Sequence, residues 1–352
     1  IVAWGTNMVS SNAHQWPFVE EARRRGARLV TVDPYRSRTA EKSDQHVALL
    51  PGTDAALALG MMHVVFRDGL EDRDYLHRYT VGADDLRRRA AEWPLERAAE
   101  TTGLAAAEIE AFAREYAGSH PSAIRINYGV NRHAGGGMAV RTLACLPAVV
   151  GAWRHPGGGI LLSTSAAYPV RTDALQRPDL SPPGTRAINM SQLGRVLTDG
   201  ALEPPVKALF VYNSNPAAVA PDQESVQRGL ARDDLFTVVH ELFPTDTVDF
   251  ADIVLPATST LEHYDIHKSY GHLYVSLNRP AIPPRGEALS NPEVFRRLAV
   301  RLGLDHPCLR DRDEDMARQA FDWDHPHMAG ITLERLEKET SLRLNVPDPY
   351  VP

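Results

Sequence analysis

The chain has 352 residues, of which 43% are hydrophobic and 24% charged, so it can bury a core, and its length favours two domains. Its formal net charge of -7 argues against a nucleic acid as partner, because a phosphate backbone is bound through an excess of Lys and Arg. The two cysteines, Cys145 and Cys308, lie too far apart in sequence to form a CxxC metal or cluster motif. No apolar run reaches the roughly 18 residues that a membrane span needs.

The first residue is Ile1 rather than methionine, and residues 1–4 already have the apolar composition of a buried strand. The opening residues lack the charged and then apolar pattern of a signal peptide. We therefore expect the sequence to be part of a longer protein. These features leave the compartment open between the cytoplasm and the periplasm of a prokaryote.

The first half alternates strands and helices. Residues 1–4 are predicted as a strand, 16–25 as a helix with Pro17 in its first turn, and 28–32 as a second strand. This order within some thirty residues is typical of a parallel βαβ unit, which binds ligands at the carboxyl ends of its strands. A strand at 46–50, an apolar helix at 55–67 with Asp54 as its cap, a helix at 104–116 and a strand at 123–128 follow.

The second half is predicted to begin with a helix at 138–150 and a long Pro- and Gly-rich loop at 168–184. Strands at 207–212, 235–240 and 252–255 and helices at 223–231 and 293–302 then form a new α/β series. Residues after 305 have little apolar periodicity and are interpreted as a linker, and inspection reveals no internal repeat. The fold class predicted is α/β, with two tandem Rossmann-like domains of parallel sheets flanked by helices, at residues 1–132 and 133–352.

Glycine and polar residues follow the first two predicted strands. Gly5 and Asn7 stand where backbone N–H groups can hold a phosphate. Asp33 ends the second strand, where an acidic residue accepts hydrogen bonds from ribose hydroxyls, and Arg36 follows within reach of a phosphate. The fingerprint GxGxxG is missing, which argues against a conventional nicotinamide site but leaves another nucleotide possible. Each feature alone is also typical of an ordinary strand-to-helix turn, as Asp54 is of a helix cap.

The combination of motifs is more specific than any one of them. Residues 4–7 (WGTN), 32–36 (VDPYR) and 50–54 (LPGTD) resemble, in order and spacing, motifs of the molybdopterin oxidoreductases of the dimethyl sulfoxide reductase superfamily. The resemblance continues through 128–133 (YGVNRH), 155–159 (HPGGG), 212–216 (YNSNP), 240–247 (HELFPTDT) and 251–256 (ADIVLP). The resemblance extends to about residue 303. The part of the family that these residues resemble is the central portion of catalytic subunits like those of formate dehydrogenase and nitrate reductase.

The resemblance implies two α/β domains that each hold one molybdopterin guanine dinucleotide, with molybdenum or tungsten between them. It implies that Gly5 and Asn7 approach a pyrophosphate, that Asp33 holds a guanosine hydroxyl, and that Asp54 accepts from the guanine edge. The cofactor-binding residues that it implies are Trp4, Gly5, Asn7, Asp33, Arg36, Gly52, Thr53, Asp54, Tyr128, Arg132, Asn213, Asn215, His240, Glu241, His263 and Asn291.

The activity that the resemblance implies is two-electron oxidation or reduction of a small substrate, such as formate or an oxyanion, with an electron-transfer subunit as partner. Arg132 and His133 are the candidate catalytic residues, because an arginine suits an anionic substrate. In this family the metal ligand and the cysteines of an iron–sulfur cluster normally precede the stretch that matches Ile1. We therefore assign no metal ligand within these residues and expect them to be inactive alone.

Two other classes of function stay open. The residues Glu262, His263, Asp265, His267 and His272 could bind zinc or iron in a hydrolase or oxygenase, although no HExxH motif accompanies them. A non-catalytic module that binds a nucleotide or a partner is the second alternative. A Ser-His-Asp enzyme has less support, since no GxSxG motif occurs.

Overall fold

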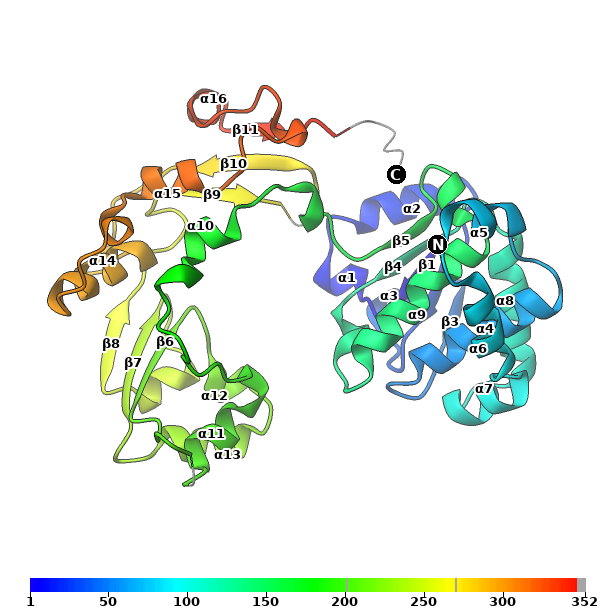
Figure 1. Ribbon diagram of the computed structural model, residues 1–352, viewed down its shortest axis with the longest axis horizontal. Helices are drawn as coiled ribbons and strands as arrows, with labels where there is room; N and C mark the ends of the chain where they lie inside the picture. Colours follow the sequence, from blue (N-terminus) through cyan, green and yellow to red (C-terminus); the bar gives the residue numbers. More distant parts are fainter. Residues whose placement is uncertain (201, 270, 347–352) are drawn as a thin grey trace. The chain divides into compact units, whose positions relative to one another are not determined.

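The computed structural model describes residues 1–200, 202–269 and 271–346. These residues form two compact units (Figure 1). The first unit contains residues 1–164 with 271–272 and 346, and the second contains residues 165–200, 202–269 and 273–345. None of the helices in these ranges combines the length and the apolar character that crossing a membrane requires.

The first unit is built on a five-stranded parallel sheet in the order β3-β2-β1-β4-β5. Its strands are short and largely buried, as expected of a parallel sheet covered by helices on both faces. Strand order reverses between β1 and β4, and the carboxyl ends of these two strands form the switch point at which such sheets bind ligands. The strands are β1 (Val2–Trp4), β2 (Val30–Val32), β3 (Gln45–Val47), β4 (Ala123–Ile126) and β5 (Gly159–Leu161).

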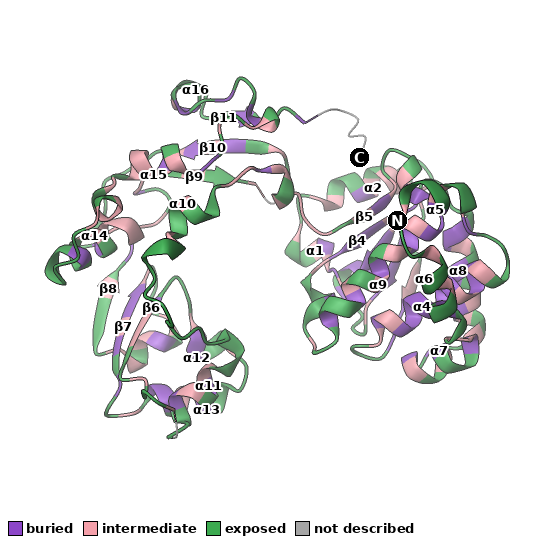
Figure 2. Ribbon diagram, viewed as in Figure 1, coloured by how far each residue is buried: buried purple, intermediate pink, exposed green. Residues whose placement is uncertain are grey.

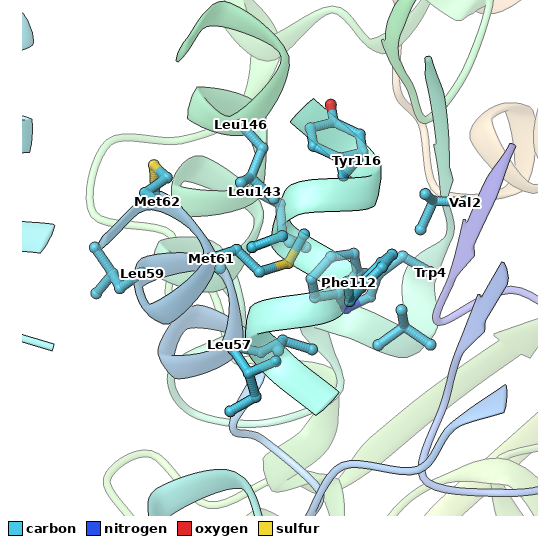
Figure 3. Close-up of a cluster of buried hydrophobic side chains, with 14 of the residues drawn as sticks. Val2, Trp4, Leu57, Leu59, Met61, Met62, Phe112, Tyr116, Leu143 and Leu146 are labelled. Atoms are coloured by element: carbon cyan, nitrogen blue, oxygen red, sulfur yellow. The ribbon is translucent and has the colours of Figure 1, made fainter. Parts of the chain in front are cut away.

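The core of the first unit lies between this sheet and α4, a helix that is apolar around most of its circumference and therefore buried (Figure 2). Side chains from α4, α8 and α9 pack there on those of β1, including Met61, Phe112, Leu143 and Trp4 (Figure 3). The helices of this unit are α1 (Met8–Ser11), α2 (Trp16–Arg24), α3 (Arg38–Glu41), α4 (Asp54–Arg67), α5 (Arg73–Tyr79), α6 (Ala83–Ala91), α7 (Leu95–Thr102), α8 (Ala106–Gly118) and α9 (Gly136–Val149), with short 3₁₀ turns at Tyr128–Asn131 and Ala152–Arg154.

The second unit contains two three-stranded sheets. One is parallel in the order β6-β7-β8, and the other is antiparallel in the order β11-β10-β9. The strands are β6 (Ala208–Tyr212), β7 (Phe236–Glu241), β8 (Ile253–Pro256), β9 (Asp265–Lys268), β10 (Tyr274–Asn278) and β11 (Ser341–Arg343). The helices are α10 (Thr172–Gln176), α11 (Leu193–Thr198), α12 (Pro216–Val219), α13 (Gln223–Leu230), α14 (Asn291–Arg301), α15 (Asp313–Gln319) and α16 (Leu333–Glu339).

The predicted mixed α/β architecture, with a parallel sheet flanked by helices, is confirmed in the first unit. That unit extends beyond the boundary predicted after Arg132, because α9 packs on α4 and β5 pairs with β4. The linker interpretation of the residues after 305 is wrong, since α15, α16 and β11 lie there and bury Met328 and Leu336 completely. Asp54 is the first residue of α4 rather than its cap.

The structure also reveals an internal repeat that inspection of the sequence missed. Strands β1, β2 and β3 correspond to β6, β7 and β8 at a constant shift of 208 residues: Val2 pairs with Val30 as Phe210 pairs with Val238. The pairing of β2 with β3 and of β7 with β8 keeps the same shift. Helices α1 and α12 keep it too. Residues 2–47 therefore correspond to residues 210–255 without insertion or deletion, although few residues are identical between the two segments.

Candidate functional site

In the first unit, the loop after β1 is held by Asn7. Its Oδ1 accepts hydrogen bonds from the backbone N–H of Thr39 at 3.3 Å and from the Thr39 hydroxyl at 3.1 Å. The same hydroxyl accepts from the N–H of Val9 at 3.1 Å. Thr39 is fully buried at the start of α3, so this network joins the strand-end loop to the short helix that follows β2.

The loop after β6 in the second unit repeats this network. Asn215 Oδ1 accepts from the backbone N–H of Thr247 at 3.2 Å and from its hydroxyl at 2.8 Å, and this hydroxyl accepts from the N–H of Ala217 at 3.1 Å. Asn215 Nδ2 also donates to Asp246 at 2.8 Å, which lowers the pKa of that carboxyl. The structure therefore uses the predicted ligand residues Asn7 and Asn215 to brace two equivalent strand-end loops.

The backbone of the two loops follows the same path. Gly5 has φ +58° and donates its N–H to Val32 O at 2.9 Å, and Asn213 has φ +50° and donates its N–H to His240 O at 3.3 Å. Glycine is required at position 5, since a Cβ there would lie 2.6 Å from Cγ2 of Val130. The positive φ and this close packing are enough to explain why residue 5 is glycine, so the glycine by itself is not evidence of a bound ligand.

An acidic residue follows β2 and ends β7, at equivalent positions. Asp33 Oδ1 accepts the N–H of Tyr35 at 3.0 Å, and Glu241 Oε1 accepts the N–H of Leu242 at 2.7 Å. Partial burial raises the pKa of the Asp33 carboxyl, and nearby Asp54 raises it further. Burial disfavours the charged form of the Asp33 carboxyl, and a bound hydroxyl group that donates a hydrogen bond to it would offset this effect.

Trp4, Asp54 and His133 come together at the carboxyl end of β1. The indole Nε1 of Trp4 donates to Asp54 Oδ1 at 2.7 Å, and His133 Nε2 lies 3.8 Å from Asp54 Oδ2. Trp4 is fully buried and Asp54 is 7% exposed, whereas the buried Nε2 of His133 has no hydrogen-bond partner among the described residues. Trp4 therefore positions the Asp54 carboxylate and does not itself face a ligand.

The remaining predicted residues of the first unit are more exposed. Tyr128 is 46% exposed, and Arg132 and Arg36 are exposed and have no hydrogen bond or ion pair within the described ranges. Thr53 donates its hydroxyl to Leu50 O at 2.6 Å, and Gly52 lies beside the His133 ring. Gly52 and Thr53 also border a hollow of about 960 Å³ whose walls come mainly from α4, α6 and α9. None of the other predicted residues lines that hollow.

A cavity of about 750 Å³ lies at the carboxyl ends of β6, β7 and β8 in the second unit. Four of the residues predicted from the sequence line it: Asn213, Glu241, His263 and Asn291. His240 is fully buried outside this lining, where its Nδ1 lies 3.1 Å from Leu255 O and its Nε2 lacks a partner in the described part of the chain. The volume is in the range of small-molecule sites.

The rival metal cluster does not form. The carboxylate of Glu262 accepts hydrogen bonds from the backbone N–H and the hydroxyl of Ser259 and from the backbone N–H of Arg285. These hydrogen bonds lower the pKa of Glu262. His263 Nδ1 lies 2.9 Å from the Thr258 hydroxyl. Across residues 1–200, 202–269 and 271–346, no group of three or more His, Cys, Asp and Glu side chains has an arrangement that could hold a metal ion. The hydrolase or oxygenase alternative thus loses its site.

Arg125, in β4, is a residue that the sequence reasoning missed. It is 7% exposed, and its guanidinium donates to Gln15 Oε1 and to the carbonyls of Ile126, Leu161 and Leu162, with no carboxylate partner among the described residues. A buried cation usually requires a partner of opposite charge. The signal in the sequence was a charged residue inside the apolar strand 123–126.

Comparison with known proteins places these features in context. The model of the family described as molybdopterin oxidoreductase matches residues 1–301. The chain is 45% identical, over its whole length, to the probable oxidoreductase YoaE of Bacillus subtilis, of which it covers 52%. It is 27% identical to the F420-dependent formate dehydrogenase subunit alpha of Methanocaldococcus jannaschii, with coverage of 91% of the chain and 49% of that protein.

A solved structure is also similar. The chain matches the structure of acetylene hydratase from Pelobacter acetylenicus with a TM-score of 0.75 and 26% identity, over 99% of this chain and 52% of that one. The chain therefore spans about half the length of the relatives it matches.

Proposed function

The chain belongs to the molybdopterin oxidoreductase family, and from this premise we propose that it is the part of a molybdenum or tungsten oxidoreductase that holds a bis(molybdopterin guanine dinucleotide) cofactor. The observation that carries the proposal is the internal repeat. The same strand register, loop-bracing network and terminal acidic residue occur twice, 208 residues apart. A cofactor with two equivalent dinucleotide arms requires two such sites.

In the first unit, the residues that would hold a dinucleotide are those at the carboxyl ends of β1 and β2. Asp33 has a raised pKa and would accept hydrogen bonds from ribose hydroxyls. The buried hydroxyl of Thr6 has no partner in the described ranges and lies in the loop after β1. Asp54, aligned by the Trp4 indole, would accept the paired N–H donors of a guanine edge. The acceptor groups of Asp33 and Asp54 therefore fit the hydroxyl and N–H donors of a guanosine group.

In the second unit, Glu241 is the counterpart of Asp33 and borders the 750 Å³ cavity, where His263 and Asn291 add polar groups. Asn215 would act indirectly by fixing the loop. When bound, the cofactor supplies two-electron chemistry at its metal, and the protein supplies position and orientation. Exposed Arg132 would bind an anionic substrate by charge-assisted hydrogen bonds, with His133 beside it.

The names of the relatives do not converge on one substrate. One is named a hydratase and another a subunit of a formate dehydrogenase. We propose a small substrate such as formate or an oxyanion and an electron-transfer subunit as partner. The second name supports only the presence of partner subunits in that relative.

The test is metal, pterin and guanine nucleotide content, measured on the full-length protein and on residues 1–352 purified side by side. We expect molybdenum or tungsten with about two pterins and two guanine nucleotides in the full-length protein. Absence of pterin and nucleotide from the full-length protein would contradict the proposal and favour a binding module without redox chemistry.

A further inference from the structure

Arg125 is a buried cation whose charge is not balanced in the described part of the chain. Only 7% of the residue is exposed. Its Nη1 donates to the carbonyls of Ile126 at 2.9 Å, of Leu161 at 3.1 Å and of Leu162, which lie at the carboxyl ends of β4 and β5. Its Nε donates to Gln15 Oε1 at 3.1 Å. Carbonyl and carboxamide oxygens satisfy N–H donors but carry no full negative charge, so the charge of the guanidinium remains uncompensated.

One amino group of this guanidinium has no partner. Nη2 carries two N–H donors, and it makes no hydrogen bond or ion pair with any described residue. It is not among the polar atoms that are both fully buried and without a partner, so part of it is accessible to solvent. The carbonyls at the strand ends fix the rest of the guanidinium. Arg125 therefore offers two N–H donors of fixed direction, an arrangement that suits an oxygen anion.

Gln15 provides further donors beside Arg125. The Nε of an arginine can only donate, so the carboxamide atom that faces it is the oxygen. This oxygen also accepts a hydrogen bond from Asn12 Nδ2 at 3.0 Å. The Nε2 of Gln15 is left without a hydrogen bond in the described ranges, although the residue is half-buried at the start of α2. Two side chains that are hydrogen-bonded to each other thus both have unused N–H donors, and no carboxylate accompanies them.

This pair lies apart from the residues assigned to the dinucleotide. Arg125 is the register partner of Ala3 in β1, and both alternate with residues that pack in the core beside α4, such as Trp4 and Ile126. Because successive side chains of a strand point to opposite faces, Arg125 lies on the face where Ala3 packs with residues of α1 and α2. Trp4 and its partner Asp54 belong to the α4 face.

We propose that Arg125 and Gln15 form a binding site for a small planar oxygen anion, of the size of formate or nitrate, which accepts hydrogen bonds from Nη2 and Nε2. The anion supplies the negative charge that the buried guanidinium lacks. It is small, because only the end of a side chain that is 7% exposed can reach it, and paired N–H donors match a planar anion. The inference goes beyond the proposed function, since the site needs no cofactor and does not involve Arg132.

The test substitutes Gln15→Glu in the full-length protein. A glutamate keeps the shape of the side chain, accepts from Arg125 Nε and supplies the missing charge from within the protein. The matched control is Gln45→Glu, because Gln45 Oε1 likewise accepts from an arginine, Arg28, at 2.9 Å, but Arg28 already has an ion pair with Glu115 at 3.1 Å. The melting temperature is measured by calorimetry while sodium formate replaces sodium chloride at constant ionic strength, so that charge screening stays equal.

We expect the parent to melt about 3 °C or more higher when formate is at about ten times its dissociation constant. Gln15→Glu should melt about 2–4 °C above the parent in chloride and should not respond to formate. Gln45→Glu and Arg132→Ala should both respond as the parent does. Arg125→Met, which removes the cation, should not respond if it folds, and Gln15→Glu decides the matter if it does not.

Two results would overturn the inference. The first is a parent that melts at the same temperature in formate and in chloride, which would mean that the guanidinium only ties the ends of β4 and β5 together or finds its counter-charge elsewhere in the protein. The second is a response that Gln15→Glu keeps, above all if Arg132→Ala abolishes it, since the anion would then bind at Arg132. Neither result depends on whether the protein carries pterin, so the proposed function is tested separately.

Discussion

The loop-bracing threonines allow a matched test of the repeat. Thr39 and Thr247 are both fully buried, and each hydroxyl donates to an asparagine and accepts one backbone N–H. Thr39→Val and Thr247→Val keep the shape of the side chain but remove both interactions. Each leaves a backbone N–H without its acceptor, so we expect each to cost about 2–3 kcal/mol. In units of this size that corresponds to a fall in melting temperature of about 4–12 °C.

The assay is differential scanning calorimetry of the full-length protein, with Thr39→Ser and Thr247→Ser as controls. Serine keeps the hydroxyl and loses one methyl group, which costs about 1 kcal/mol. The valine variants should therefore be less stable than the serine variants in both units and should also release guanine nucleotide faster. The reasoning would be refuted if valine were tolerated as well as serine at both positions.

Three further predictions concern individual side chains. Trp4→Phe removes the only hydrogen bond found for Asp54 Oδ1 in the described part of the chain, and should destabilise the protein by about 2–4 kcal/mol in thermal unfolding; an unchanged melting temperature would contradict the positioning role. Because the folded-state pKa of Asp33 is raised, its ionisation destabilises the fold, so Asp33→Asn should gain stability over the parent as pH rises from 3 to 7, and a pH-independent difference would refute this. Arg132→Ala should raise KM for an anionic substrate about tenfold in the full-length protein and leave its melting temperature unchanged, because the side chain is exposed; an unchanged KM would remove Arg132 from the substrate site.

Local patterns determined much of the first unit. Short apolar runs such as residues 1–4 and 28–32, separated by an amphipathic helix, predict parallel strands, because such runs are typical of parallel sheets that helices cover on both faces. Motif order was sufficient to predict the family, which the comparison confirms. The strand ends also directed attention to Gly5 and Asp33, since ligands bind at the carboxyl edge of such sheets, whereas Glu241 was identified through the family resemblance.

Only the tertiary structure decided which partners these residues have. Trp4 and Asp54 are 50 positions apart, so their hydrogen bond depends on α4 packing beside β1. The repeat was invisible in the sequence because strand register and backbone hydrogen bonding tolerate many side chains, and only a few positions such as Asn7 and Thr39 recur unchanged. The left-handed backbone conformation of Asn213 could be seen only in the φ angle of the structure. Asn215 is the same residue type two positions later, but its φ is negative and its carboxamide is hydrogen-bonded to Thr247 and Asp246.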